Sequence, residues 1–239
     1  MQNLQEVIQT PKFPLSKVVV DEQSSKNSFC QIIEQLPPKS NLTLYEQTWE
    51  DYENLLETIG ETRGLRISFD SETLEIMTLS TEHEHYAQII TRIVDRLSVS
   101  QDIEIVFFGS ATIKKSQFAK GTEPDACFYV QSVKEIGDKI RLDFSVDPPP
   151  DIAVEIDLYH ESLNKFPIYA ALGVAEIWRY SDEKFEIYKL KNGIYESIEK
   201  SESLPVLSAE ILGQLLNRSR QERQTKILKE FENWLKTQK

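Results

Sequence analysis

One short segment, residues 151–157, alternates between polar and aliphatic side chains as a β-strand does, and three of its polar positions are acidic. Alternate side chains of a strand point to opposite faces, so Glu155 and Asp157 project side by side, away from the aliphatic face. Two carboxylates at the end of a buried strand repel each other and lose hydration, so we expect them to need a cation or a shared proton. Mg²⁺ is the natural partner, because it binds one or two carboxylates, keeps water ligands and accepts a phosphate oxygen.

A third acid and a lysine extend this group. Asp125 follows Pro124 at the head of a second expected strand, and Lys165 lies in the first turn of a helix expected to follow the strand that carries Glu155. From there its ammonium could reach back to the strand end, hold an attacking hydroxide and stabilise the charge of a pentavalent phosphate. The alternative is a set of ordinary solvated acids, which are common at strand ends.

The elements that must position these residues indicate a mixed α/β protein, in which helices flank a β-sheet. Thr48 and Ser80 or Thr81 begin two helices, and a short helix over 162–172 ends at Gly173. Strands are expected at 65–69, 73–79, 103–107, 111–114, 125–130, 139–144, 152–158, 174–180, 185–190 and 194–198, of which the first two form a hairpin and the last three an antiparallel meander. We divide the chain into an N-terminal extension (1–40), a domain with the candidate site (41–205) and a helical C-terminal tail (206–239).

The composition limits the possible partners and compartments. A net charge of -12 opposes non-specific nucleic-acid binding, so a nucleic-acid site would need local basic residues or a divalent metal. Two cysteines suit a reducing cytosol, and neither a signal peptide nor a transmembrane stretch is evident. We therefore expect a cytoplasmic protein without membrane contacts.

Three segments resemble a known family, the Uma-two-type "putative restriction endonucleases" of cyanobacteria. They read GTEPDACFY from residue 121, DIAVEID from residue 151 and SLNKFPIYAALGVAEIWRY from residue 162, and weaker similarity extends the match to roughly residues 42–200. The resemblance implies the restriction-endonuclease-like PD-(D/E)XK fold and hydrolysis of DNA phosphodiester bonds with Mg²⁺, or with Mn²⁺ in its place. It places Asp125 and Glu155 at the acidic motif positions and Asp157 where the motif normally has lysine, with Lys165 moved to the next helix. It also implies that Glu82 or His83 lines the site.

Several alternatives remain open from the sequence. A catalytically inactive protein of the same fold, acting as a binding or regulatory module, is compatible with the acidic charge. His83, His85 and His160 form a weak candidate for a zinc site, and Ser162 with Lys165 has the spacing of serine acyl-transfer enzymes. A homodimer would suit an enzyme that cuts both DNA strands. Nearby lysines that could contact phosphates are Lys114, Lys115, Lys120, Lys134 and Lys139.

Overall fold

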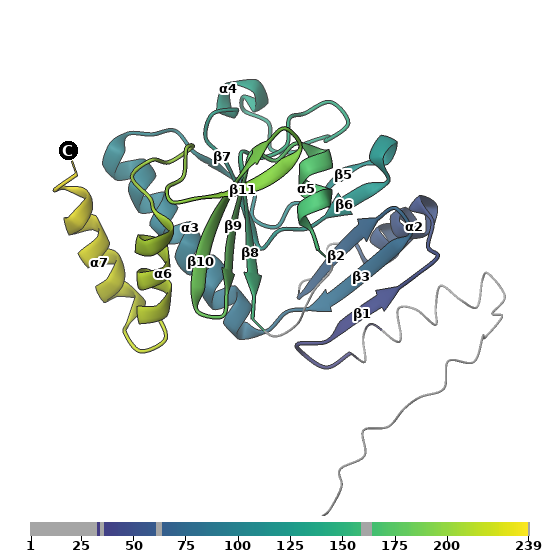
Figure 1. Ribbon diagram of the computed structural model, residues 1–239, viewed down its shortest axis with the longest axis horizontal. Coiled ribbons are helices and arrows are strands. Elements are labelled where there is room, and N and C mark those ends of the chain that lie inside the picture. The colour runs from purple at the N-terminus through teal and green to yellow at the C-terminus, as the bar shows by residue number, and fades with distance from the viewer. Residues whose placement is uncertain (1–32, 34–35, 61–63, 159–163, 239) are drawn as a thin grey trace, which may run out of the picture. The chain divides into compact units, whose positions relative to one another are not determined.

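The structure is a computed structural model that describes residues 33, 36–60, 64–158 and 164–238. The chain divides into two compact units, residues 1–35 and 36–239, and only Ile33 of the first unit is described. The predicted N-terminal extension therefore lies mostly outside the described residues. All elements below belong to the second unit (Figure 1).

The described strands form two sheets, and the first has the order β1-β3-β2-β6-β5. Its strands are β1 (Asn41–Leu44), β2 (Leu65–Asp70), β3 (Thr73–Thr78), β5 (Ile113–Lys115) and β6 (Lys120–Thr122). Helix α2 (Trp49–Ile59) begins with a capping box between Thr48 and Asp51. From this helix the ring of Tyr52 stacks on Phe69 of β2, with 5.2 Å between the ring centroids, and so joins the helix to the sheet.

The second sheet has the order β11-β10-β9-β8-β7-β4. Its strands are β4 (Val106–Phe107), β7 (Ala126–Tyr129), β8 (Ile152–Asp157), β9 (Glu176–Ser181), β10 (Lys184–Lys191) and β11 (Ile194–Ile198). β8 and β9 are parallel because helix α5 (Phe166–Leu172) carries the chain back between them, whereas the other neighbouring strands of this sheet are antiparallel. The hairpin of β2 and β3 and the meander of β9 to β11 confirm two predictions.

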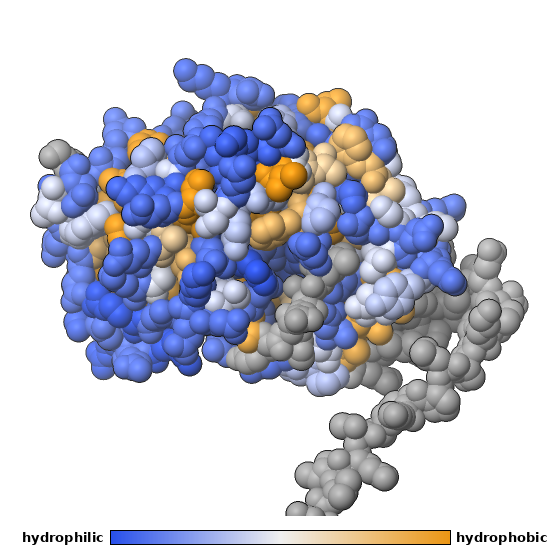
Figure 2. Space-filling model, in the orientation of Figure 1, coloured by the Kyte–Doolittle hydropathy of each residue, from blue (hydrophilic) through white to orange (hydrophobic). Residues whose placement is uncertain are grey.

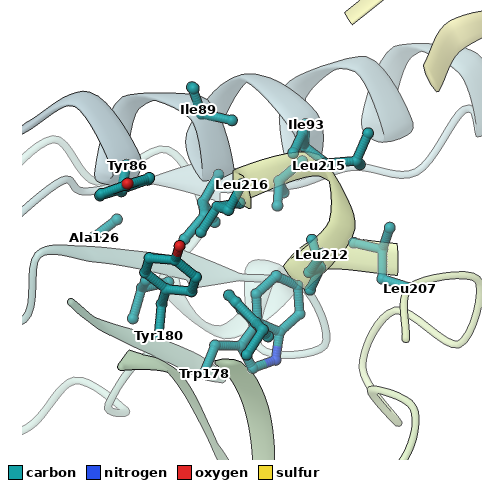
Figure 3. Close-up of a cluster of buried hydrophobic side chains, with 14 of the residues drawn as sticks. Tyr86, Ile89, Ile93, Ala126, Trp178, Tyr180, Leu207, Leu212, Leu215 and Leu216 are labelled. Carbon is teal, nitrogen blue, oxygen red and sulfur yellow. The ribbon is translucent and has the colours of Figure 1, made fainter. Parts of the chain in front are cut away.

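Helices α3 (Thr81–Gln101), α6 (Ala209–Arg218) and α7 (Gln224–Leu235) contribute to the main hydrophobic core with the aliphatic face of β8. Figure 3 shows part of this core, where the ring of Tyr86 on α3 lies near that of Tyr180 on β9. The opposite face of β8 and β9 contributes Ala153 and Ile177 to a second cluster with α5. The predicted tail helices thus share the core of the sheet rather than standing apart from it.

Segment 139–144 is not a strand in the structure, contrary to the sequence prediction. Asp147 there accepts hydrogen bonds from the backbone of Asp143 and from Lys139, and Asp143 accepts two from Ser145. Such local side-chain bonds offer the backbone an alternative to a strand ladder. A short helix α4 (Val133–Ile136) and a 3₁₀ turn at Ser116–Phe118 also separate the strands of this region.

The surface is mostly polar. The face shown in Figure 2 is largely hydrophilic, with hydrophobic residues in small patches. Within the described ranges, no helix is long and apolar enough to cross a membrane. The mixed α/β class, with helices beside the sheets and at the C-terminal end, agrees with the sequence prediction.

Candidate active site

The polar face of β8 lies under the start of α5 and carries the predicted acids. Glu155 pairs with Arg179 in the parallel β8–β9 ladder, and Arg179 pairs with Glu186 in the antiparallel β9–β10 ladder. Paired residues point to the same side of a sheet, so these three side chains form a row of alternating charge. Asp157 lies two residues beyond Glu155 on the same face.

Glu155 and Lys165 form a buried ion pair. Lys165 immediately precedes α5, rather than lying in its first turn, and its Nζ is 2.7 Å from Glu155 Oε2. The two side chains are only 6% and 5% exposed. The hydroxyl of Tyr169, one turn further along α5, donates to the other carboxylate oxygen, Glu155 Oε1. The carboxylate is thus held on both oxygens by the same segment of chain.

Burial, together with the charges of Asp125 and Asp157, raises the pKa of Glu155 to about 7, against the opposing effect of the Lys165 charge. Burial lowers the pKa of Lys165, but the negative charges of Glu155 and Asp125 outweigh it, so that this pKa is raised. Burial and the Glu155 charge both raise the pKa of Tyr169, which keeps its hydroxyl protonated as a donor. The charges of Asp125 and Asp157 thus lie close enough to Glu155 to affect its ionisation.

Asp125 connects the two sheets. It precedes β7, and its Oδ2 accepts a hydrogen bond of 2.8 Å from the backbone N–H of Ile156, so that its carboxylate continues the β7–β8 ladder. Its Oδ1 lies 3.3 Å from Nε of Arg66 on β2. This is an ion pair without a hydrogen bond, because Nε of Arg66 has no hydrogen-bond partner among the described residues. Arg66 also lies 3.8 Å from Glu84 of α3.

Asp157 is held by a third cation. Nε of Arg179 donates to Asp157 Oδ2 at 2.6 Å. The Arg179 side chain is 37% exposed, so this pair lies at the open side of the site, in contrast to the buried pair of Glu155 and Lys165. Each predicted acid is therefore neutralised by its own basic residue: Arg66, Lys165 or Arg179.

His83 lies beside this group, whereas Glu82 contributes to a neighbouring hollow. Burial lowers the pKa of His83, while the charges of Asp125 and Asp157 and a hydrogen bond to the backbone of Ile156 oppose that effect. Glu82 helps to line a hollow of about 450 Å³ with Tyr86, Leu158, Tyr180, Asp182, Glu183 and Arg220. Glu84, rather than Glu82, is the acid of α3 that pairs with Arg66.

The zinc alternative loses support from the hydrogen-bond partners. His85 bonds to Ser219 and Gln224 at the α6–α7 turn, away from the partners of His83. His160 and Ser162 lie outside the described residues, so the acyl-transfer alternative stays untested.

Three of the lysines proposed as phosphate contacts are occupied by acids. Lys114 binds Glu53, Lys120 binds Asp70 and Lys139 binds Asp147. Surface pairs of this kind are weak, but they reduce the positive charge that these lysines could offer to a phosphate. These three lysines therefore do not form a basic cluster that would bind nucleic acid.

A divalent metal is compatible with the chemistry of the acids. Carboxylate oxygens are preferred ligands of Mg²⁺, and Asp125, Glu155 and Asp157 supply them from adjacent strands. Across the described residues, however, no three His, Cys, Asp or Glu side chains are already gathered as metal ligands. The acids therefore fit the metal in ligand type, and each of them has a cationic partner in the structure.

Arg66 and Tyr169 are the members of this site that the sequence reasoning missed. Arg66 comes from the other sheet, so no spacing connects it with Asp125. Tyr169 lies four residues after Lys165, on the same face of a helix, and this spacing was the available signal.

Comparison with known proteins places this site in a family. The family model Uma2, described as "Putative restriction endonuclease", matches residues 49–220. Among solved structures, the chain resembles a "putative nuclease belonging to DUF820" from Anabaena variabilis ATCC 29413 with 15% identity and a TM-score of 0.49, over 71% of this chain and 98% of that one. No curated protein matches. The family match covers most of the chain, including all four predicted site residues, and the protein belongs to the Uma2 family.

Proposed function

We propose that this protein is a metal-dependent endonuclease that hydrolyses DNA phosphodiester bonds at Asp125, Glu155, Asp157 and Lys165. The observation that carries the proposal is the buried contact between Lys165 and Glu155. This contact places a lysine from the start of α5 beside the acids of β8. A nuclease of this class needs such a lysine when aspartate, here Asp157, occupies the motif position that normally carries it. Membership of the Uma2 family supports the same reaction class.

The acids would hold Mg²⁺, or Mn²⁺ in its place. When bound, the metal would supply Lewis-acid polarisation of a phosphate oxygen and a more acidic water ligand. Asp125 is fixed for this role by the Ile156 N–H, and Glu155 by Tyr169. Side chains already held in place lose little freedom when a ligand binds, which favours catalysis.

Lys165 supplies positive charge next to the acids. Its ammonium is buried and carries its proton, so it can stabilise the negative charge that develops on the phosphate in the transition state. The low exposure strengthens this electrostatic effect, because little water screens it. Lys165 would therefore act on the transition state more than on DNA affinity.

A second candidate is a catalytically inactive protein of the same fold that binds a partner. The complete pairing of the three acids with Arg66, Lys165 and Arg179 favours it, because paired acids do not need a metal for stability. The net charge of -12 gives the chain no general affinity for DNA. The first candidate predicts DNA cleavage that requires a divalent metal, whereas the second predicts no cleavage with or without the metal.

The test is cleavage of supercoiled and linear DNA with Mg²⁺ or Mn²⁺. Wild type is compared with Glu155→Ala, Lys165→Ala and the control Lys189→Ala, which removes a lysine of β10 that pairs with Glu202 outside the site. We expect cleavage by wild type and by the control, and a loss of at least about a hundredfold in both site variants. Absence of metal-dependent cleavage by folded wild-type protein on either substrate would favour the binding candidate.

A further inference from the structure

Arg179 differs from the other two cations of the site in its freedom to move. Its side chain is 37% exposed, against 9% for Arg66 and 6% for Lys165. Lys165 is fixed beside the start of α5, and Arg66 also donates to the backbone carbonyl of Leu65. Arg179 can therefore leave its acid for solvent or for another partner at a lower cost than either of the others.

A second acidic partner for Arg179 is already in place on β10. Glu186 lies directly opposite Arg179 in the β9–β10 register, on the same face of the sheet. Tyr188 is two residues further along that face, and its hydroxyl donates to Glu186 at 3.0 Å. Arg179 already interacts electrostatically with both residues. The side chain thus lies between Asp157 on one neighbouring strand and Glu186 on the other.

The ion pair between Lys184 and Glu186 does not prevent Arg179 from exchanging Asp157 for Glu186. Lys184 Nζ lies 2.6 Å from Glu186, but its side chain is 71% exposed. Ion pairs with such an exposed member contribute little free energy, so Arg179 can share Glu186 with Lys184 or replace it.

The charge balance explains why the exchange matters. Asp125, Glu155 and Asp157 are matched by three cations, so the group has no formal charge to attract a divalent ion. Once Arg179 leaves Asp157, the negative charge of that carboxylate is no longer compensated, and the nearest cation that would repel a metal is removed. Metal affinity should then depend on where Arg179 lies.

We propose that Arg179 is an exchangeable counterion of the site, which holds Asp157 when no divalent cation is bound and moves to Glu186 when one binds. This inference rests on the proposed metal-dependent function and adds a control of metal affinity to it. Arg179 is in this sense a positioning residue, because it acts through Asp157.

The test measures Mn²⁺ affinity by calorimetry without DNA, so that cleavage does not enter the result. In Arg179→Met we expect Mn²⁺ to bind about tenfold more tightly than in wild type, because Asp157 has lost its competing cation. Arg179→Gln repeats the test with a polar side chain in case the Met variant folds poorly. In Glu186→Gln we expect weaker binding than in wild type, because Arg179 has lost its second acidic partner.

The matched control is Lys189→Met, which removes the same charge from β10, has a side chain of similar exposure (38%) and pairs with Glu202 rather than with Glu186 or Asp157. We expect its Mn²⁺ affinity to stay within about twofold of wild type, since an exposed charge is well screened. An equal gain in Lys189→Met and Arg179→Met would reduce the effect to overall charge and overturn the proposal. Unchanged or absent Mn²⁺ binding in both folded Arg179 variants would also overturn it.

The DNA cleavage assay separates this inference from the proposed function. Tighter Mn²⁺ binding in the Arg179 variants without any cleavage by wild type would uphold the counterion and refute the nuclease. Metal-dependent cleavage by wild type with no gain of affinity in these variants would do the reverse.

Discussion

The pair of Glu155 and Lys165 gives a stability prediction that does not depend on catalysis. In Lys165→Met, the carboxylate of Glu155 stays buried and, among the residues that the structure describes, keeps the Tyr169 hydroxyl as its side-chain donor. Removal of one partner of a buried ion pair typically costs about 3–5 kcal/mol. Because domains of this size are stable by roughly 5–15 kcal/mol, the variant should be folded but marginal near pH 8.

The same substitution should make stability depend strongly on pH. Burial has already raised the pKa of Glu155 to about 7, and the loss of Lys165 removes the charge that opposed this rise. The folded variant then binds a proton that the unfolded chain releases, so its free energy of unfolding falls as pH rises above the ordinary glutamate pKa. The fall reaches about 1.4 kcal/mol per pH unit and ends above the folded-state pKa.

Urea unfolding at pH 5, 6.5 and 8 measures both effects. The double variant Glu155→Gln with Lys165→Met is the control, because it removes both charges and should cost less than the single change at pH 8. A cost below about 1 kcal/mol at pH 8, or a cost equal at all three pH values, would mean that the pair is solvated and would refute the reasoning.

Three further predictions concern the structure around the site. In Gly121→Ala, the new Cβ would lie 2.4 Å from the hydroxyl oxygen of the fully buried Tyr52, so we expect a loss of about 1–3 kcal/mol in urea unfolding and partial rescue by Tyr52→Phe. Burial raises the pKa of Cys127 to about 12, so in a Cys30→Ser background a thiol reagent should label Cys127 only as the protein unfolds. The carboxylate of Asp151 accepts hydrogen bonds from three consecutive backbone N–H groups. In Asp151→Asn these bonds are weaker, so we expect the free energy of unfolding to fall by about 1.5–3 kcal/mol in the same assay. An unchanged free energy of unfolding would mean that water replaces those bonds.

Local patterns predict most of the second sheet and its helices. The alternation in residues 152–157 is sufficient to place Glu155 on the polar face of β8, because the period of a strand fixes which side chains share a face. Thr48 and Ser80 are correctly predicted as caps of α2 and α3, since a cap depends only on the few residues that follow it. The same reasoning fails for 139–144, where the side chain of Asp147 overrides the apolar pattern.

The site is predictable only where its contacts are local. Lys165 is close in sequence to the strand it serves, and the connection from β8 through α5 brings it back to Glu155. Arg66 meets Asp125 only because β2 and β7 belong to two sheets that approach at this point, and no periodicity in the sequence encodes that approach. The catalytic roles of these residues stay predictions until cleavage is measured.

The acidic composition has a local counterpart that changes how DNA binding should be explained. The chain as a whole repels a polyanion, yet the three acids of the site are already neutralised by Arg66, Lys165 and Arg179. A phosphate approaching this group therefore meets dipoles and exposed guanidinium rather than bare carboxylates. Bound divalent metal would make the same group positive, so metal and phosphate should each favour the binding of the other. Under the proposed function, the net charge of -12 would limit non-specific binding without preventing a phosphodiester from reaching a site that holds the metal.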